Sequence, residues 1–400
     1  MSARDVGVVG DGPAGSALAR SLERRGVDVV LIGADRPWTA TYTTWIDDLD
    51  GVDGIGAGAG GIDDQDVWLH RFDSIAAHFE RSLTIPRGYG VLDNERLHAV
   101  LRDGVRHEVR DVTAVADVDA RLVVDATGWP SGLGPADLGD ADVGDVGNVS
   151  WQTAFGVVLP EPPSNSLGVP TMMDFSDPPS AGGSLRPTFA YALPVADGWL
   201  VEETVLAGPA IDPDALSGRL ASRLGLTVDD MLARADRIER VRIPMGAPIP
   251  GHDPVTARFG AAAGMIHTAT GYSVAASLRA ADRVADAIVE RLDVTRKPND
   301  ARADAEAVAA AVWPTALRRS RRLHDYGLDV LLAMDVDEIR RFFETFFSLP
   351  REQWAAYLRI DTPPRDLARV MSTMFRRADW GLRRRLVSRN PRLLFGVLRP

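Results

Sequence analysis

Close to its N-terminus the chain reads Val6-Gly7-Val8-Val9-Gly10-Asp11-Gly12-Pro13-Ala14-Gly15. The apolar residues before Gly10 predict a short buried strand, and residues 16–25 are typical of a helix. Gly26 ends that helix, and residues 27–32 predict a second, parallel strand. A strand, a glycine-rich turn, a helix and a strand within about thirty residues form the context in which the GxGxxG pattern binds a dinucleotide.

The three glycines of this pattern, Gly10, Gly12 and Gly15, allow a tight turn and a close approach of the backbone to a pyrophosphate at the helix N-terminus. The acid that commonly binds the ribose hydroxyls at the end of the second strand is replaced by Gly33. Asp35, two residues later, is a candidate for this contact, and a solvent-facing loop aspartate is the alternative. The sequence therefore predicts a nucleotide-binding domain.

The composition is that of a globular chain with room for more than one packed unit. The 400 residues are 45% hydrophobic and 25% charged, which excludes wholesale disorder and a polytopic membrane protein. A net charge of −11 is unfavourable for binding nucleic acid. Cysteine is absent, so disulfides and cysteine-bound metals are excluded. Because the sequence also lacks an HExxH motif, clustered histidines and calcium-loop spacing, we expect no metal.

Further elements follow along the chain. Residues 121–125 predict another strand, which ends in Asp125-Ala126-Thr127-Gly128. Residues 151–159 and 188–206 alternate in the manner of strands in a second sheet. Helices are predicted for residues 272–292 and for most of residues 301–395, where prolines separate them.

Two segments bear on the membrane. Phe259–Leu278 is uncharged and long enough to span a bilayer, but its glycines and His267 favour a buried loop that leads into a helix. Residues 375–400 contain eight arginines and one acid among apolar side chains. That segment either lies on an anionic membrane surface or forms an exposed helix with an arginine-rich face. Since the apolar run from Val6 opens a fold and not a leader, we expect a cytoplasmic protein.

Several ordered motifs resemble those of the flavoprotein lycopene cyclases of bacteria and plants, and the resemblance covers most of the chain. The matching segments are Gly10–Gly15, Tyr42–Asp48, Asp125–Gly128, Trp151–Val157, Met173–Phe175, Pro187–Tyr191, Leu200–Thr204, Ile243–Gly246, Gly260–Tyr272, Trp313-Pro314 and Arg340–Phe343. So many matches in the family's order identify the family more specifically than the substrate.

The resemblance implies an α/β fold like that of p-hydroxybenzoate hydroxylase, in which a Rossmann-type FAD-binding domain carries an inserted β-sheet substrate domain. Residues 1–150 and 240–295 would form the FAD-binding domain. Residues 151–239 would form the sheet that covers the flavin and supplies catalytic groups, and residues 296–400 a helical C-terminal region.

The resemblance also implies FAD in its reduced form, with NAD(P)H as a candidate reductant. A glycine-rich loop that runs into a helix presents N–H groups and a positive dipole end, which suits the N1–C2=O edge of a flavin. Besides the fingerprint glycines and Asp35, the predicted flavin contacts are Asp125, Thr127, Gly128, Gly264, Met265, Thr270 and Gly271.

The family's reaction is a redox-neutral cyclisation of an acyclic carotenoid end group, in which a proton adds to the terminal alkene, the next double bond attacks the cation, and a proton leaves. Glu202 and Glu203 are adjacent, so on a strand only one of them can face the reacting end. The resemblance favours Glu202 as the acid, kept protonated by burial, and Glu203 as a support for it or for deprotonation. Reduced FAD would stabilise the cation. Two surface glutamates on an edge strand are the alternative.

Five further residues are predicted to line the substrate pocket: Tyr42, Trp45, Asp48, His267 and Tyr272. Trp45 is equally typical of a hydrophobic core. For His267, a hydrogen-bonded position in the loop is the alternative to a direct role.

The expected partner is a carotenoid or another polyprenyl chain, reached by peripheral contact with the inner face of the membrane. Three other functions stay open: cyclisation of another prenyl or meroterpenoid substrate, a redox flavoprotein such as a hydroxylase or prenyl reductase, and a non-catalytic flavin or polyprenyl carrier. A redox enzyme would change the mass of its substrate, whereas a cyclase would not.

Overall fold

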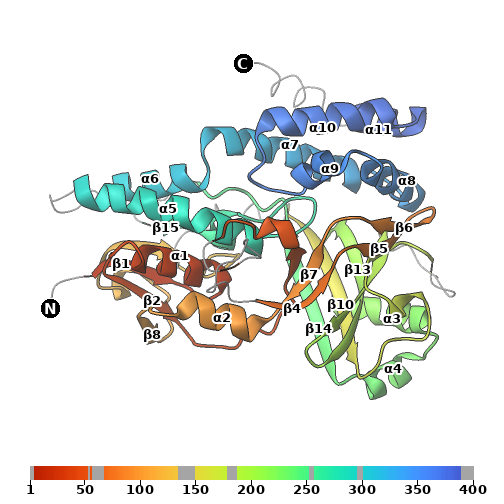
Figure 1. Cartoon of the computed structure of the whole chain (residues 1–400), viewed down its shortest axis with the longest axis horizontal. Helices are drawn as coiled ribbons and strands as arrows, with labels where there is room; N and C mark the ends of the chain where they lie inside the picture. Colours follow the sequence, from red (N-terminus) through yellow and green to blue (C-terminus); the bar gives the residue numbers. More distant parts are fainter. Residues whose placement is uncertain are drawn as a thin grey trace.

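The computed structural model describes residues 4–52, 55, 67–133, 149–177, 187–251, 256–294 and 301–388. Figure 1 shows three regions: a parallel sheet with its helices, a large sheet beside it, and a helical layer above. In the part of the chain that is described, no helix combines the length and the apolar character needed to cross a bilayer.

A five-stranded sheet begins at the N-terminus, and all its neighbouring strands are parallel. In sheet order its strands are β15 (Ala257–Arg258), β9 (Ala120–Asp125), β1 (Arg4–Val9), β2 (Val29–Gly33) and β8 (His107–Val109). The central strand β1 is covered on both faces, which is why it reads as a continuous apolar run. The predicted strand, turn, helix and strand are confirmed.

Helices cover this sheet on the face that the fingerprint helix occupies. α1 (Pro13–Glu23) follows the glycine turn directly, with a proline in its first turn where no N–H is required. α5 (Val274–Val294) packs beside α1, while α2 (Asn94–Arg102) and α6 (Ala301–Val312) contribute to the same core. Because α5 begins at Val274, Phe259–Leu278 is a buried loop leading into a helix, as predicted.

The second sheet has seven strands and is antiparallel except between β11 and β5. In order they are β14 (Arg237–Met245), β10 (Ser150–Leu159), β13 (Gly198–Gly208), β12 (Thr188–Val195), β11 (Thr171–Asp174), β5 (Ile75–His78) and β6 (Ser82–Ile85). The strands predicted for a second sheet are confirmed. The sheet also takes β5 and β6 from residues 1–150, and β14 runs across residue 240.

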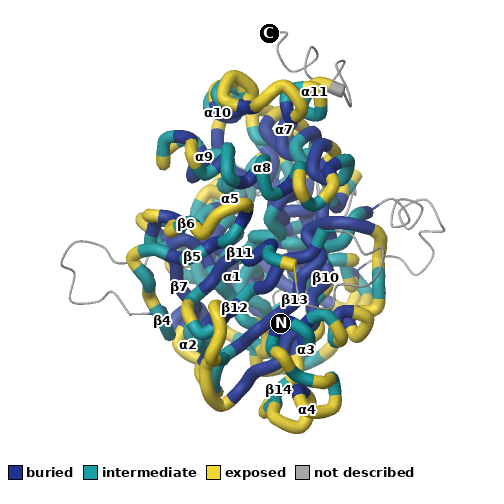
Figure 2. The backbone as a smooth tube through the Cα atoms, turned by 90° about the vertical axis from the view of Figure 1, so that its right-hand side faces the viewer, coloured by how far each residue is buried: buried dark blue, intermediate teal, exposed yellow. Residues whose placement is uncertain are grey.

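Much of this sheet is buried, as the dark strands β10 and β13 show in Figure 2. One face packs on α3 (Ser217–Leu224) and α4 (Val228–Arg234), through Leu220 and Met231. A small sheet of β3 (Thr43–Trp45), β7 (Tyr89–Leu92) and β4 (Trp68–Phe72) lies between the two larger sheets in Figure 1.

The helical region continues with α7 (Thr315–Leu332), α8 (Val336–Phe347), α9 (Arg351–Tyr357), α10 (Pro364–Arg377) and α11 (Trp380–Ser388). Pro314, Pro350 and Pro363 directly precede α7, α9 and α10, so the prolines separate the helices as predicted. The apolar face of α8 packs towards the large sheet, where Phe343 stacks on Phe79 at a centroid distance of 5.5 Å. These helices therefore form a layer that covers the second face of the large sheet.

Candidate active site

A cavity of about 510 Å³ lies between the large sheet, the small sheet and α8. Strands β10, β12, β13 and β14 supply its sheet wall, and the phenylalanines of α8 supply part of the opposite wall. The loop before α5 closes one end through Thr270, Gly271 and Tyr272. A cavity of this size is typical of a site for a small organic ligand.

Glu202 lies in the middle of β13 and borders this cavity. It is directly opposite Gly156 of β10 and Tyr191 of β12, so the three residues share one face of the sheet. The residue is 9% exposed and makes no hydrogen bond or ion pair with any residue that the structure describes. Burial, assisted by the charge of Glu239, raises the pKa of Glu202 to about 8, so the carboxyl is protonated at neutral pH.

Glu203 faces the other side of the sheet, which confirms that only one of the two glutamates can reach the cavity. It is fully buried, and its carboxylate accepts a hydrogen bond from Nε of Arg223 and lies 3.3 Å from Nε of Arg219, both on α3. We expected Glu203 to assist the reaction. Its carboxylate is instead paired with Arg219 and Arg223 between the sheet and α3, on the side away from the cavity.

Three tyrosine hydroxyls and a threonine form a cluster in the cavity wall. The hydroxyl of Tyr89 lies 3.0 Å from that of Tyr191 and 3.0 Å from that of Tyr272, and it donates to Oγ1 of Thr43 at 2.8 Å. Burial raises the pKa of all three tyrosines, so their hydroxyls stay neutral. Tyr89 was not predicted from the sequence, because it lies on a short strand far from the quoted motifs.

Glu239 on β14 is a second buried carboxylate in the cavity wall that the sequence analysis missed. Its Oε1 accepts a hydrogen bond from Oγ1 of Thr41 at 2.7 Å and another from Nη1 of Arg237. The sequence did contain one indication of this pair. Arg237 and Glu239 are two residues apart, and residues with that spacing on a strand share a face and can form an ion pair.

Three of the five predicted pocket residues, Tyr42, Trp45 and Tyr272, line the cavity. Trp45 is fully buried and packs edge-on against Tyr89 at a centroid distance of 5.0 Å. Its indole Nε1 is buried without a hydrogen-bond partner among the described residues. Trp45 is therefore both a core residue and a wall of the cavity.

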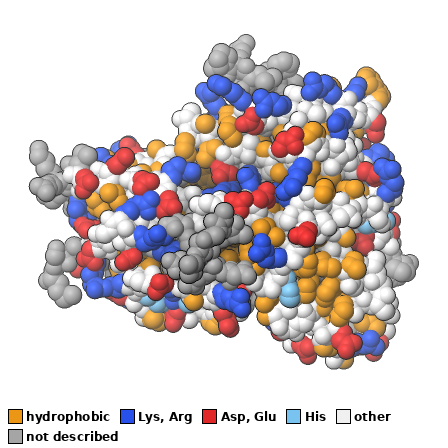
Figure 3. All heavy atoms as spheres, viewed as in Figure 1, with side chains coloured by type: hydrophobic (Ala, Val, Ile, Leu, Met, Phe, Trp, Pro, Cys, Tyr) orange, Lys and Arg blue, Asp and Glu red, His pale blue; other side chains and the backbone are white. Residues whose placement is uncertain are grey.

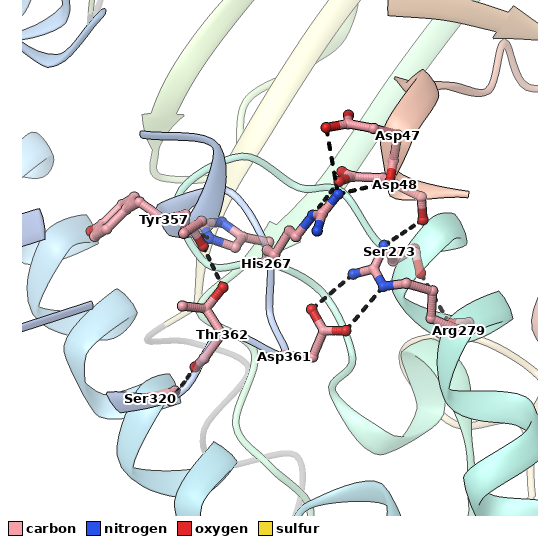
Figure 4. A network of polar contacts seen from close by, with 12 residues as sticks. Asp47, Asp48, His267, Ser273, Arg279, Ser320, Tyr357, Asp361 and Thr362 are labelled. Atoms are coloured by element: carbon pink, nitrogen blue, oxygen red, sulfur yellow. Dashed lines mark hydrogen bonds and ion pairs between the residues drawn. The ribbon is translucent and has the colours of Figure 1, made fainter. Parts of the chain in front are cut away.

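Asp48 does not line the cavity. Its Oδ1 accepts hydrogen bonds from Nη2 of Arg87 at 2.6 Å and from Nε of Arg359 at 2.5 Å. Its backbone carbonyl accepts from Nη1 of Arg279 at 2.7 Å, and Arg279 also pairs with Asp361 at 2.9 Å (Figure 4). Asp48 therefore links the turn after β3 to the helical region through an ion pair with Arg359. This contact explains why its side chain is buried outside the cavity.

His267 also lies outside the cavity lining. Its Nε2 is 3.0 Å from the carbonyl oxygen of Tyr357 (Figure 4). Its Nδ1 accepts from the N–H of Ala269 at 3.3 Å. Because Nδ1 accepts, Nε2 is the donor. Burial lowers the pKa of His267 to about 4, so the ring is neutral. The structure matches the alternative of a hydrogen-bonded loop histidine.

The fingerprint glycines have distinct environments at the turn between β1 and α1. Gly10 has a φ of 106°, and a β-carbon on Gly15 would lie only 1.9 Å from the carbonyl oxygen of Gly10. A β-carbon on Gly12, by contrast, would meet nothing within 4 Å. Gly10 and Gly15 are therefore required by the fold, whereas Gly12 leaves open space beside the N-terminus of α1, where a phosphate can bind.

The carboxyl ends of β1 and β2 carry a group of charged side chains. Asp35 accepts from Nη1 of Arg102 at 2.6 Å, and its N–H donates to Oδ2 of Asp11 at 2.8 Å. A β-carbon on Gly33 would lie 2.1 Å from Cγ of Asp11, so Asp11 fills the space of an acid at that position. Asp11, Asp35 and His107 place atoms that could bind a metal ion within 4.8 Å of one another. Arg102 forms ion pairs with both carboxylates, so a cation already balances their charge. Asp35 is thus held by Arg102 and by Asp11 at the carboxyl end of β2, and its contact with a ribose stays a prediction.

Asp125 fixes the turn that follows β9. It is fully buried, and its Oδ1 accepts from the N–H of Thr127 at 2.9 Å and from Oγ1 of Thr127 at 2.6 Å. Gly128, with a φ of 103°, has open space where a β-carbon would project. Asp125 therefore shapes the turn, and the half-buried Thr127 and Gly128 are the more accessible part of this predicted contact.

The loop before α5 separates its predicted flavin contacts into two groups. Thr270 and Gly271 border the cavity. Gly264 and Met265 lie beneath α7, where Nη1 of Arg321 donates to the carbonyl oxygen of Gly264 at 2.9 Å and Met265 is buried. Only the later part of the loop can therefore contact a ligand in the cavity.

Curated proteins with similar sequences include several carotenoid and lycopene cyclases. The chain is similar to an uncharacterized carotenoid cyclase of Deinococcus radiodurans, at 35% identity over 93% of this chain and 90% of the relative. It is also similar to the lycopene beta cyclase of Synechococcus elongatus, at 31% identity over 94% and 95% of the two chains. The lycopene beta cyclase of Arabidopsis thaliana matches at 30% identity over 88% of this chain and 74% of the relative.

Among solved structures, a geranylgeranyl bacteriochlorophyll reductase-like protein from Thermoplasma acidophilum matches with a TM-score of 0.62 over 98% of this chain and all of that chain, at 15% identity. A flavin-dependent brominase matches with a TM-score of 0.56 over 94% of this chain and all of that chain, at 14% identity. These likenesses concern the fold, and they confirm the predicted Rossmann-type flavoprotein architecture.

A family model described as lycopene cyclase protein matches residues 5–383, which include nearly all of the three sheets and most of the helical region. That span contains the β1–α1 turn, Glu202 and the α8 wall of the cavity. The chain therefore belongs to the lycopene cyclase protein family.

Proposed function

We propose that this protein is a carotenoid cyclase that closes a ring at the end of an acyclic, lycopene-type chain without net oxidation or reduction. The observation that carries the proposal is the buried carboxyl of Glu202, without a polar partner among the described residues, in a cavity walled by aromatic rings. Family membership and relatives named lycopene beta cyclase support the substrate class.

Glu202 acts as the acid. Burial keeps its proton in place at neutral pH, and the carboxyl donates it to the terminal alkene carbon, which leaves a tertiary cation and a carboxylate. The neighbouring double bond attacks the cation, and the ring is completed when a proton leaves an adjacent carbon. One proton is added and one is removed, so the product has the mass of the substrate.

The cavity favours this chemistry because most of its lining around Glu202 is apolar or aromatic. Charges that form in a dry site attract one another far more strongly than in water. Phe343, Phe346 and Phe347 of α8 and Trp45 of β3 border the same space. Aromatic faces attract a cation by about 0.5 to 2 kcal/mol each, so these rings would stabilise the positive charge as the ring closes.

We propose FAD as the cofactor, and the residues present fit it. Gly12 leaves room for a pyrophosphate beside α1, Asp35 is the candidate for the ribose contact, and Thr270 and Gly271 bring the loop before α5 to the cavity wall. When bound in its reduced form, with NAD(P)H as the candidate reductant, FAD would supply a negative charge that stabilises a cation.

We further propose peripheral contact with an anionic membrane through α10 and α11. Of the seven large apolar side chains exposed in the described part of the chain, three lie here: Phe375, Trp380 and Val387. Trp380 is 75% exposed. Figure 3 shows basic side chains along the edge of the molecule where Figure 1 places these helices. An exposed apolar and basic face of this kind suits an anionic lipid surface.

A second cavity opens beside the proposed membrane face on α10 and α11. It has a volume of about 380 Å³, lies among α7, α8, α10 and α11, and is bordered by Phe375 and Val387 of the proposed membrane face. Phe346 of α8 borders both this cavity and the one that contains Glu202. We propose that a long polyene reaches from the first cavity past Phe346 into the second.

Flotation with liposomes tests the membrane face. The double variant Phe375→Ser/Trp380→Ser should lose most of its binding to vesicles that contain an anionic phospholipid. Leu232→Ser is the matched control, because Leu232 is also exposed but lies on α4. Equal flotation of the double variant and the wild type would contradict the proposed membrane face.

An anaerobic assay with lycopene in detergent micelles and chemically reduced FAD tests the proposed activity. We expect a cyclised product of unchanged mass, no product when the flavin stays oxidised, and loss of turnover in Glu202→Gln. A product changed by two hydrogens or one oxygen would instead place the protein among the redox flavoproteins.

A further inference from the structure

Two buried glutamates face the cavity from strands on either side of Gly156. Gly156 of β10 is directly opposite Glu202 of β13 and also directly opposite Glu239 of β14. The three side-chain positions therefore lie in one row on one face of the sheet. Because neighbouring strands are about 4.8 Å apart, the two glutamate backbones are separated by about 10 Å.

The residue between them is a glycine, so the space above it is not filled by a side chain. A β-carbon on Gly156 would lie 2.7 Å from Cγ of Glu202 and 3.2 Å from its Oε1. Glu202 thus leans over Gly156, towards the strand that carries Glu239. Both glutamates border the same cavity, so a ligand in it can contact both carboxyl groups.

The surroundings of the two carboxyl groups are opposite in character. Glu202 has no polar partner among the described residues and is held in its neutral form. Glu239 accepts hydrogen bonds from Thr41 and from the guanidinium of Arg237, which are contacts that an ionised carboxylate makes. Two acids whose environments favour different protonation states can serve as an acid and a base in one reaction.

The hydrogen bonds to Glu239 leave one of its oxygens available. Both Thr41 and Arg237 donate to Oε1. Oε2 has no hydrogen bond to any residue in the described part of the chain. The carboxylate is therefore anchored through one oxygen and can accept a proton through the other.

We propose that Glu239 is the base that completes cyclisation, taking the proton that leaves the ring. This inference rests on the proposed function. Glu202 gives one proton to the alkene and becomes a carboxylate. The C–H bond beside the ring cation then breaks, its electron pair forms the new ring double bond, and its proton passes to Oε2 of Glu239. Between turnovers Glu202 regains a proton from solvent and Glu239 releases one, so no electrons are gained or lost.

Two other buried carboxyl groups are unsuited to this task. Glu203 is bound by Arg223 and Arg219 behind the sheet, and Asp48 is bound by Arg87 and Arg359. Neither of them borders the cavity. The position of Glu239 relative to Glu202 would also select which ring carbon loses its proton, and hence which ring isomer forms.

The experiment compares Glu239→Gln with Glu202→Gln in the FAD-loaded, reduced protein, with lycopene in micelles and no oxygen. For Glu239→Gln we expect turnover to fall by about 100-fold or more, the usual effect of losing a general base. The remaining product should shift from the wild-type ring isomer to isomers with the double bond elsewhere, or to an alcohol formed when water captures the cation. Glu239→Asp, which keeps a carboxylate, should recover part of the rate and the wild-type product.

Glu203→Gln is the matched control, because it makes the same change beside Glu202 but on the opposite face. In the folded fraction it should leave the product ratio unchanged. Wild-type turnover and product ratio in folded Glu239→Gln, together with loss of activity in Glu202→Gln, would overturn this inference alone. Absence of any cyclised product from the wild type would instead overturn the proposed function.

Discussion

A β-carbon added to Gly156 would lie 2.7 Å from Cγ of Glu202, closer than two such carbons can approach. Glycine at this position therefore sets the place of the acid on the neighbouring strand. The same absence of a side chain opens the space between Glu202 and Glu239. Gly156 has no side chain that could take part in the reaction, but it determines where the carboxyl group of Glu202 lies.

Gly156→Ala should reduce cyclisation strongly with a smaller effect on folding. The added methyl group would push Glu202 out of its position, and overpacking of this kind destabilises by about 1–3 kcal/mol. Turnover and thermal melting of the purified variant check this. Unchanged turnover in Gly156→Ala would show that the position of Glu202 does not limit the reaction.

The activity should fall as the pH rises above about 8. The pKa of Glu202 is raised to about 8, so the donor form is lost above that pH. Rates measured with FAD kept reduced across the pH range check the position of this alkaline limb. A rate that stays constant well above pH 8 would contradict the assignment of Glu202 as the acid.

Stability should depend on pH for the same reason. The folded protein keeps the Glu202 proton up to about pH 8, whereas an unfolded chain releases it near the ordinary glutamate pKa of 4.5. The contribution of Glu202 to stability is therefore fully present below about 4.5 and is lost as the pH rises to about 8, at no more than about 1.4 kcal/mol per pH unit. Chemical unfolding of Glu202→Gln should lack this decline, and an identical decline in both proteins would assign it to other groups.

Glu203→Gln should destabilise the fold without changing the reaction. It removes the charge that balances Arg223 and Arg219, and loss of one partner of a buried pair costs about 3 kcal/mol or more. Chemical denaturation measures the loss, and turnover per folded molecule measures the activity. Normal stability combined with altered products would reverse the roles of the two adjacent glutamates.

Gly12→Ala should weaken FAD binding by tenfold or more while leaving the fold intact. Its β-carbon meets no protein atom within 4 Å, so any effect comes from the space that the pyrophosphate would occupy. Gly15→Ala is the contrasting variant, because its β-carbon would collide with Gly10 and should destabilise the apo-protein. FAD titration and melting of the apo-protein distinguish the two, and unchanged FAD affinity in Gly12→Ala would place the pyrophosphate elsewhere.

The sequence predicted the parts of the fold that local pattern controls. The apolar run before Gly10, the glycine turn and the proline-separated helices all appear where expected. The addition of β5 and β6 to the large sheet was not predictable, because pairing between strands far apart in the chain leaves no local pattern.

The candidate site was predicted in part for a similar reason. Alternation along a strand placed Glu202 and Glu203 on opposite faces, but it did not show which arginines hold Glu203. Asp48 and His267 carry reactive side chains, yet partners from the helical region occupy them. Glu239 was missed because its relation to Glu202 depends on the register of β14 and β13 against β10.

The most direct measurement of the central claim is the deuterium content of the product formed from lycopene in D₂O with reduced FAD. Proton donation from Glu202, followed by loss of a different hydrogen from the ring, predicts one deuterium for each ring closed and no other change in composition. A product without deuterium, or one whose mass differs by two hydrogens or an oxygen atom, would contradict the account.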